Sequence, residues 1–282
     1  MKSRIISIII PTYNRGDLLV RAVQSVIDLE TEVWELIIVD DGSFDDTKIK
    51  LLPFLTDRRI RYFYQKNKGV SAARNKGVEI ANGEYLIFLD SDDTLHKDLL
   101  SFLIKAEFYR YDIICWQVIK FIDGKKSIWR PVKLGKIYNG IIASFLAGSI
   151  CYKKQVFLNV GGYDESMKFG ENYELGMRVS NKKDLKVKII NKSLLFNYVN
   201  TTHRTSNSLE NRIHSYFHMY EKHRKRYLKD RKSNFEINYL IAYVLEKSGK
   251  PVAALKFYKK SWLIAPWKTK PLLKFFYFSL FS

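Results

Sequence analysis

The chain contains 282 residues, of which 46% are hydrophobic and 15% aromatic, and its formal net charge at pH 7 is +19. This composition excludes a disordered chain, and the length is enough for one large domain or for a medium domain with an appendage. From Leu209 onward there are 16 basic and 5 acidic side chains, so more than half of the surplus charge belongs to the last quarter and favours an anionic partner.

The first 96 residues alternate between predicted strands and predicted helices. Short β-branched apolar runs predict buried strands at 5–10, 34–39, 60–64 and 85–89, and helical spacing of apolar residues predicts helices at 17–28, 47–55 and 69–81. The first run follows an early positive charge, as in a signal peptide, but Pro11 stops it and no small-residue cleavage site follows. The alternation predicts a parallel α/β sheet flanked by helices, with right-handed crossovers.

The remaining residues divide into two regions. Residues 97–208 open with an amphipathic helix and then mix strand-like pieces at 113–121, 150–152, 186–190 and 194–199 with a helix that begins near 169. From residue 209 the periodicity is helical, with helices expected at 209–229, 234–248 and 251–264. We therefore expect a domain over 1–208, with halves 1–96 and 97–208, and a basic, aromatic helical extension over 209–282.

Each of the first four predicted strands ends in a polar sequence. PTYN, DDGS, QKNKG and DSDD follow them in turn. In parallel α/β sheets the ligand lies outside the carboxyl ends of the strands, where these four sequences converge. The sequence therefore predicts a ligand site at this edge.

DSDD, residues 90–93, places three carboxylates directly after a predicted buried strand. Clustered carboxylates repel one another and are costly unless a cation or hydrogen-bond donors offset them. A divalent ion with oxygen ligands, Mn²⁺ or Mg²⁺, is one explanation, and it would retain sites for a diphosphate. The alternative is that Asp92 or Asp93 only caps the next helix.

The other strand ends also have a binding and a structural interpretation. Asp41 in VDDGS has a carboxylate that is able to accept the imide N–H of a uracil ring, or it belongs to an ordinary turn. Tyr13 in PTYN offers a ring to a base, or the segment only ends a strand. Lys68 lies in a basic loop before a helix N-terminus, a suitable place for phosphate. Arg74 lies among small residues in that helix and is a better ligand candidate than Lys76, which we expect on a solvated face.

Four motifs occur in order along the first 205 residues or so. They are IIIPTYNR at 8–15, LIIVDDGSFDDT at 36–47, NKGVSAARNKGVEIANGEYLIFLDSDD at 67–93 and GGYDESMKFGENYELGMRV at 161–179. In order and spacing they closely resemble the family 2 inverting glycosyltransferases, which have the Rossmann-like GT-A fold. The resemblance implies transfer of a sugar from a nucleotide-diphosphate donor, most often a UDP-sugar, to an acceptor hydroxyl with inversion, together with a divalent metal.

The resemblance also implies roles for individual residues. Pro11, Tyr13 and Asp41 would frame the base of the nucleotide, Asp90 would hold ribose or sugar hydroxyls, and Asp92 would ligate the metal that bridges the diphosphate. The expected acceptor is a glycan or a lipid-linked molecule, as in the assembly of cell-surface polysaccharide, lipopolysaccharide or glycolipid.

Two further contacts follow from the same resemblance. Arg74 would contact the sugar or the phosphate. Lys68 is expected on the donor side from its place in the basic loop, not from the resemblance. The segment THRTSNS at 202–208 resembles a family stretch near the diphosphate, which makes His203 a second metal or phosphate contact. An exposed loop histidine is the alternative.

The acidic helix start departs from the family pattern. In the family this start usually reads Glu-Asp, and the aspartate is the general base, but here the second position is Asn172. A carboxamide is no base near neutral pH, and a general base commonly supplies a factor of roughly 10² to 10⁴ in rate. Three alternatives follow: Glu171 or Glu174 substitutes, the acceptor needs little assistance, or the protein is a non-catalytic or very slow sugar-nucleotide-binding protein. We favour a working enzyme.

The basic extension combines aromatic and aliphatic residues at helical spacing with lysine and arginine. This pattern is typical of helices that lie on an anionic membrane surface, and the alternative is that the aromatics pack on the catalytic domain. Charge and aromatics also fit nucleic-acid binding, but no recognisable motif for it is present, so we expect no nucleic-acid partner.

The expected location follows from cysteine usage and hydropathy. Cys115 and Cys151 are the only cysteines, which favours buried thiols in a reducing cytosol over a disulfide framework. No window of about 18 uninterrupted apolar residues predicts a spanning helix. We expect a cytoplasmic protein that is peripheral on the cytoplasmic face of the membrane.

Overall fold

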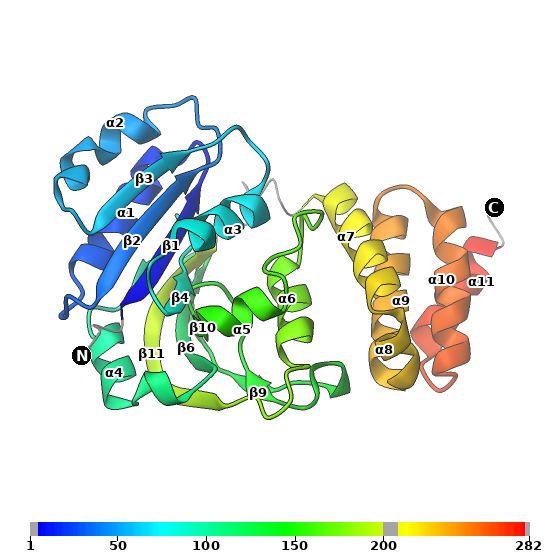
Figure 1. Ribbon diagram of the computed structural model, residues 1–282. Helices are drawn as coiled ribbons and strands as arrows, with labels where there is room; N and C mark the ends of the chain where they lie inside the picture. Colours follow the sequence, from blue (N-terminus) through cyan, green and yellow to red (C-terminus); the bar gives the residue numbers. More distant parts are fainter. Residues whose placement is uncertain (1–4, 200–207, 280–282) are drawn as a thin grey trace. The chain divides into compact units, whose positions relative to one another are not determined.

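The computed structural model describes residues 5–199 and 208–279, and the described residues form two compact units (Figure 1). The first unit contains the sheet and helices α1–α6. The second contains the helices from Leu209 onward together with two short segments, Leu134–Gly140 and Ser166–Gly170. The second unit therefore takes in chain from both sides of the boundary predicted at residue 208.

The first unit is built on a mixed sheet with the order β3-β2-β1-β4-β10-β6-β11-β5, in which β7 also pairs with β6. Strands β3, β2, β1 and β4 are parallel to one another, whereas β10 runs antiparallel to both β4 and β6. The strands are β1 Ile6–Thr12, β2 Trp34–Asp40, β3 Ile60–Tyr64, β4 Tyr85–Phe88, β5 Thr94–Leu95, β6 Ile113–Ile122, β7 Lys125–Trp129, β10 Ile150–Lys153 and β11 Val187–Val199; β8 Val132–Lys133 and β9 Ile142–Ala143 form a separate pair.

Helices connect these strands and cover the sheet. They are α1 Gly16–Ile27, α2 Thr47–Leu51, α3 Val70–Ile80, α4 Leu99–Lys105, α5 Lys154–Asn159 and α6 Glu171–Val179, with 3₁₀ turns at Leu52–Thr56, Phe108–Arg110 and Lys136–Tyr138. The predicted helix at 47–55 is thus a short α-helix that continues as a 3₁₀ turn. Pro53 lies in that turn, and its missing N–H is compatible with the change of geometry.

The sheet is the core of the first unit because its central strands are buried on both faces. Every residue of β1, β2 and β4 is buried, as expected for parallel strands covered by helices. Helix α3 packs closely on β1 at Gly77, where a Cβ added to the glycine would lie 2.4 Å from a methyl carbon of Ile9. The backbone of α3 at Gly77 therefore packs directly on the side chain of Ile9, and Arg74, one turn earlier in the same helix, lies at the edge of the sheet beside Asp90.

The predicted strands at 186–190 and 194–199 form the single strand β11. It runs parallel to β6, with two register shifts between Ile190 and Leu195. The shifts accommodate the polar Asn191-Lys192-Ser193 that separates the two apolar runs in the sequence.

The second unit consists of α7 Leu209–Lys222, α8 Arg224–Lys229, α9 Arg231–Lys247, α10 Pro251–Ile264 and α11 Thr269–Ser279. Its interior includes Ile241 and Ala242 of α9 and Ala254 and Tyr258 of α10, all fully buried. The predicted helix at 209–229 is divided at His223, and α11 was not predicted as a helix. None of the helices in the described part of the chain is long and apolar enough to cross a membrane.

Candidate functional site

The acidic cluster follows β4, the fourth parallel strand. One carboxylate oxygen from each of Asp90, Asp92 and Asp93 lies within 4.8 Å of the others. Asp93 is buried, and burial together with the charges of Asp90 and Asp92 raises the pKa of its carboxyl group well above its usual value. Asn197 of β11 donates to both oxygens of Asp93, at 2.9 and 2.8 Å, and the backbone N–H of Tyr198 donates at 3.0 Å. The buried carboxyl group is thereby fixed to β11, the partner of the short strand β5 that directly follows Asp93.

Two arginines bind the other two carboxylates. Arg15, in the loop after β1, lies 2.7 Å from Asp92, and Arg74 of α3 lies 2.7 Å from Asp90. Arg21 of α1 also donates to the carbonyl oxygen of Asp92 at 2.7 Å. Three carboxyl groups at one point form the hard oxygen set that Mn²⁺ or Mg²⁺ prefers, so the residues present fit the predicted metal.

Arg74 connects the acidic cluster with the acidic helix start. It is 2% exposed, and besides Asp90 it donates to Glu171 at 2.9 Å. Its guanidinium carbon lies 5.0 Å from the centroid of the Tyr163 ring. A single buried cation thus holds carboxylates that are 81 positions apart in the sequence, Asp90 at the carboxyl end of β4 and Glu171 at the start of α6.

Asn172 is held in place by hydrogen bonds. The hydroxyl of Tyr163 donates to Oδ1 of Asn172 at 2.8 Å, and Nδ2 of Asn172 donates to Oε1 of Glu171 at 3.2 Å. The carboxamide therefore uses both of its polar atoms within the protein, one as acceptor and one as donor. Since position 172 is an asparagine, Glu171 is the carboxylate that lies beside Arg74 at the start of α6.

Glu174 lies in a different environment from Glu171. Its side chain is fully buried, and both of its carboxylate oxygens accept hydrogen bonds from Arg178, one turn along α6, at 2.6–3.0 Å. The same arginine also donates to the carbonyl oxygen of Val160. The predicted role of Glu174 as a substitute base therefore has less geometric support than that of Glu171.

Asp41 serves the N-terminus of α3 in this structure. Its oxygens accept from the backbone N–H groups of Lys68 at 2.8 Å and Gly69 at 2.7 Å, and from Gln65 at 2.7 Å. A carboxylate at this position satisfies helix-terminal donors and complements the helix dipole. Gly42, which follows it, has a φ of +90°, so the tight turn predicted for VDDGS is present.

The loop after β1 lies against the loop after β2. The backbone N–H of Asn14 donates to Oγ of Ser43, and the N–H of Phe44 donates to Oδ1 of Asn14. Tyr13 is 44% exposed and meets the exposed ring of Phe44 edge-on, with centroids 6.2 Å apart. Pro11 is buried within β1 beside Val39. An exposed aromatic pair thus lies next to the turn that contains Asp41.

Sequence reasoning did not assign roles to several residues that organise this site. Arg15, Tyr163 and Asn197 each bond to a predicted site residue, and the first two lie within motifs that the sequence had already marked, PTYNR and GGYDES. Lys68 contributes its backbone N–H, while Lys76 pairs with Glu79 as expected for a solvated face. His203 lies outside the described residues.

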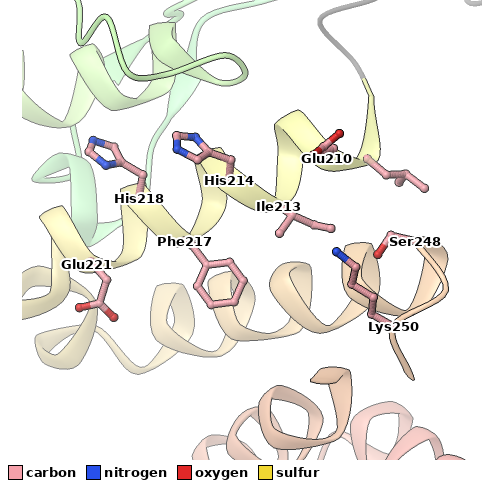
Figure 2. Close-up of a pocket in the computed structure, with 9 residues that line it drawn as sticks. Glu210, Ile213, His214, Phe217, His218, Glu221, Ser248 and Lys250 are labelled. Atoms are coloured by element: carbon pink, nitrogen blue, oxygen red, sulfur yellow. The ribbon is translucent and has the colours of Figure 1, made fainter. Parts of the chain in front are cut away.

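A hollow of about 900 Å³ lies within the second unit (Figure 2). Its lining comes from α7 and from the residues after α9, and none of the predicted donor or catalytic residues contributes to it. His214 and His218 lie side by side on α7 with parallel rings, and His218 lies 3.1 Å from Oγ of Ser166. The described residues for which the sequence predicts chemistry therefore lie at the sheet edge of the first unit and not in this hollow.

Comparison with known proteins agrees with the fold and with the motifs. Residues 7–160, more than half of the chain, match the model of the family described as Glycosyl transferase family 2. An uncharacterized glycosyltransferase of Rickettsia felis is 35% identical over 145 residues, which cover 51% of this chain and 23% of the relative. The putative teichuronic acid biosynthesis glycosyltransferase TuaG of Bacillus subtilis is 45% identical over 98 residues, 34% of this chain and 39% of TuaG.

Among solved structures, S. aureus TarS 1-349 in complex with UDP-GlcNAc is similar over 91% of this chain and 81% of that chain. The TM-score is 0.67 and the sequence identity is 17%, so this likeness concerns the fold, which is of the GT-A type. The chain spans less than half of the length of each of the two curated relatives named above.

Proposed function

Because this chain belongs to glycosyl transferase family 2, we propose that it moves a sugar from a nucleotide-diphosphate donor to an acceptor hydroxyl, with inversion. The observation that carries the proposal is the position of Arg74, which pairs with Asp90 on the expected donor side and with Glu171 on the expected acceptor side. Because one buried cation binds both carboxylates, the donor-side residue Asp90 and the proposed base Glu171 are held at a fixed separation.

The proposed donor is a UDP-sugar, and the proposed pathway is the assembly of cell-surface polysaccharide, lipopolysaccharide or glycolipid. Support comes from the relatives, since TarS is solved with UDP-GlcNAc and with UDP, and TuaG is named for teichuronic acid biosynthesis. In this chain the exposed ring of Tyr13 lies beside the turn of Asp41, where a flat base has an aromatic surface to stack on. The proposed place of action is the cytoplasmic face of a membrane.

In the proposed reaction the acceptor oxygen attacks the anomeric carbon while Glu171 takes the acceptor proton. The bond from that carbon to the diphosphate oxygen breaks, and its electron pair leaves with the nucleoside diphosphate. A single displacement of this kind inverts the anomeric centre. Asn172 and Tyr163 hold the start of α6, so the carboxylate of Glu171 keeps its place beside Arg74.

The metal that we propose is Mn²⁺ or Mg²⁺, and Asp92 with its neighbours Asp90 and Asp93 would hold it. When bound, such an ion offsets negative charge on the leaving diphosphate. Arg15 already contributes a positive charge beside Asp92. The second contact proposed for His203 lies outside the described residues.

A screen of nucleotide sugars tests the proposal, with release of the nucleoside diphosphate measured with and without Mn²⁺. We expect metal-dependent release from at least one UDP-sugar, and a loss of roughly 10²-fold or more in Asp92→Asn, because the metal that offsets the charge of the leaving diphosphate loses a ligand. The control is Asp28→Asn at the end of α1, which removes the same charge outside the acidic cluster. If no nucleotide sugar releases its nucleoside diphosphate with Mn²⁺ or with Mg²⁺, the proposed transfer is wrong.

The second candidate is a sugar-nucleotide-binding protein that does not turn over, and Asn172 is the observation that favours it. Thermal unfolding with UDP and Mn²⁺ separates both candidates from a nucleic-acid-binding protein. Ligand that binds the folded state raises the melting temperature, and a protein that lacks a donor site shows no such rise.

A further inference from the structure

The last helical hairpin has an unusual composition. Residues 251–279 contain six lysines and no aspartate, glutamate or arginine. The same residues include eight aromatic side chains, at positions 257, 258, 262, 267, 275, 276, 277 and 278. Positive charge without any negative charge, combined with so many aromatics, sets this segment apart from the rest of the second unit.

One face of α11 is both apolar and exposed. Leu273, Phe276 and Tyr277 are 66%, 57% and 57% exposed, and their spacing of three and four residues places them along one side of the helix. Lys270 lies one turn earlier on the same side and is exposed. The side that contains the buried Pro271 packs against the unit, and Lys274, at the margin between the two sides, pairs with Glu246 of α9 at 2.7 Å. The exposed face is therefore held in place by a packed one.

The outer side of α10 shows the same combination. Val252, Lys256, Lys259 and Leu263 follow one another at helical spacing, and all four are exposed. Trp267, in the connection to α11, is 65% exposed. Both helices thus present leucine or aromatic side chains beside lysines, which is the pattern of helices that lie in a membrane interface.

We propose that α10, the connection and α11 form an interfacial surface that binds an anionic phospholipid bilayer. The exposed lysines, at positions 256, 259, 268 and 270, would meet lipid phosphates, while the exposed leucine and aromatic side chains would enter the boundary between headgroups and acyl chains. The helices have 14 and 11 residues, which suits lying on a bilayer and is too short to cross one. This inference does not depend on the proposed transfer reaction.

Two other occupants fit this surface less well. A second copy of the chain would bring its own exposed lysines, at positions 256, 259, 268 and 270, against those of the first, and like charges oppose that contact. Single-stranded nucleic acid would use the lysines and aromatic rings, but it has no use for the exposed leucines. A lipid surface uses all three kinds of side chain.

The test is co-sedimentation of the full chain with vesicles of phosphatidylcholine, alone or with about one third phosphatidylglycerol. We expect binding to the anionic vesicles that weakens in roughly 0.5 M NaCl, and at least about tenfold weaker binding of the double variant Leu273→Glu, Phe276→Glu. The matched control is Leu228→Glu, Leu240→Glu, which adds the same charge at exposed leucines of α8 and α9 and should bind like the wild type. Equal melting temperatures of the two double variants would show that the fold is kept.

Three outcomes would overturn the inference. They are equal vesicle binding by both double variants, no binding of the wild type to anionic vesicles, and a wild-type dimer in light scattering that only the α11 variant disrupts. This inference is tested separately from the proposed function, because the α11 variant should still transfer sugar to a soluble acceptor while it no longer binds vesicles.

Discussion

Arg74 is buried between two carboxylates from distant parts of the chain. Its ion pairs with Asp90 and Glu171 are partly shielded from water, since the guanidinium is only 2% exposed. Desolvating a guanidinium is costly, and the two charges together offset that cost. The stability of the site therefore depends on keeping all three groups.

Replacement of Arg74 by methionine should lower the free energy of unfolding by about 3 kcal/mol or more, because it leaves two carboxylates without their shared cation. The control is Arg110→Met, which breaks an exposed ion pair with Glu107 and should cost about 1 kcal/mol or less. Urea denaturation of both variants measures the difference. Equal losses would show that the buried pairs add nothing beyond a surface pair.

At the residue scale, the sequence predicted which side chains gather but not which atoms they use. Asp90, Asp92, Arg74 and Glu171 do lie together. The use of the Asp41 carboxylate by the backbone of the α3 N-terminus was not predicted, because it depends on the path of the loop after β3. Helical spacing placed Glu171 and Glu174 on a common face, and only the packing distinguishes a partly exposed carboxylate from a fully buried one.

At the scale of the element, Glu35 joins β2 to its surroundings. Its carboxylate accepts from Oγ of Ser7 in β1 at 2.6 Å, from the backbone N–H groups of Asn82 and Gly83, and from Arg61 in β3. Burial raises the pKa of Glu35, but these hydrogen bonds and the charge of Arg61 outweigh it and hold the pKa below its usual 4.5. Three strands and the turn before β4 are thereby tied to one carboxylate.

We expect Glu35→Gln to destabilise the protein by about 2 kcal/mol at neutral pH, since hydrogen bonds to a charged group are lost. The pKa of Glu35 is lower in the folded than in the unfolded state. Its stabilisation is therefore complete above pH 4.5 and is lost as the pH falls through the folded-state pKa. The difference in the free energy of unfolding between wild type and variant, measured by urea denaturation, should therefore become smaller below pH 4.5. A gap independent of pH would contradict the assigned cause.

The first four strands were predicted nearly to the residue. Strands β1, β2 and β4 are buried on both faces and read as continuous apolar runs, whereas β3 is only partly buried and is marked by its aromatic and β-branched residues. The strands β7, β8 and β9 were not predicted. Every residue of β7 is exposed, so no pattern of burial marks it in the sequence. Helix α11 was missed because its exposed side is as apolar as its packed side.

At the scale of the whole molecule, the two units cut across the chain. Leu134–Gly140 and Ser166–Gly170 belong to the helical unit although they lie within the predicted catalytic domain. Lys168 and Phe169, for example, donate their backbone N–H groups to Ser215 of α7. A single boundary at residue 208 does not describe two units that each contain separate segments of the chain. Composition and periodicity predict only continuous segments, so they did not mark these two.

The reactivity of the two cysteines depends on whether the sheet of the first unit stays closed. Cys115 of β6 and Cys151 of β10 are fully buried in the middle of the sheet, and burial raises the pKa of the Cys115 thiol to about 12 and raises that of Cys151 as well. Thiolate is the reactive form, so both groups are doubly protected from reagents.

We therefore expect no thiol to react with an aromatic disulfide reagent at about pH 8 in the native protein, and both to react in roughly 6 M guanidinium chloride. Reaction in the native state should proceed only at the rate at which the sheet opens. Fast modification of one thiol without denaturant would contradict the described burial.

The proposed transfer depends above all on Glu171 acting as the base, in place of the aspartate that the family usually has at the position of Asn172. The most direct test compares the turnover of a UDP-sugar by the wild type, Glu171→Gln and Asn172→Asp, with UDP binding measured in parallel. We expect the wild type to turn over and Glu171→Gln to be slower by roughly 10² to 10⁴ with UDP binding retained. Turnover that appears only in Asn172→Asp, with an inactive wild type, would contradict this mechanism.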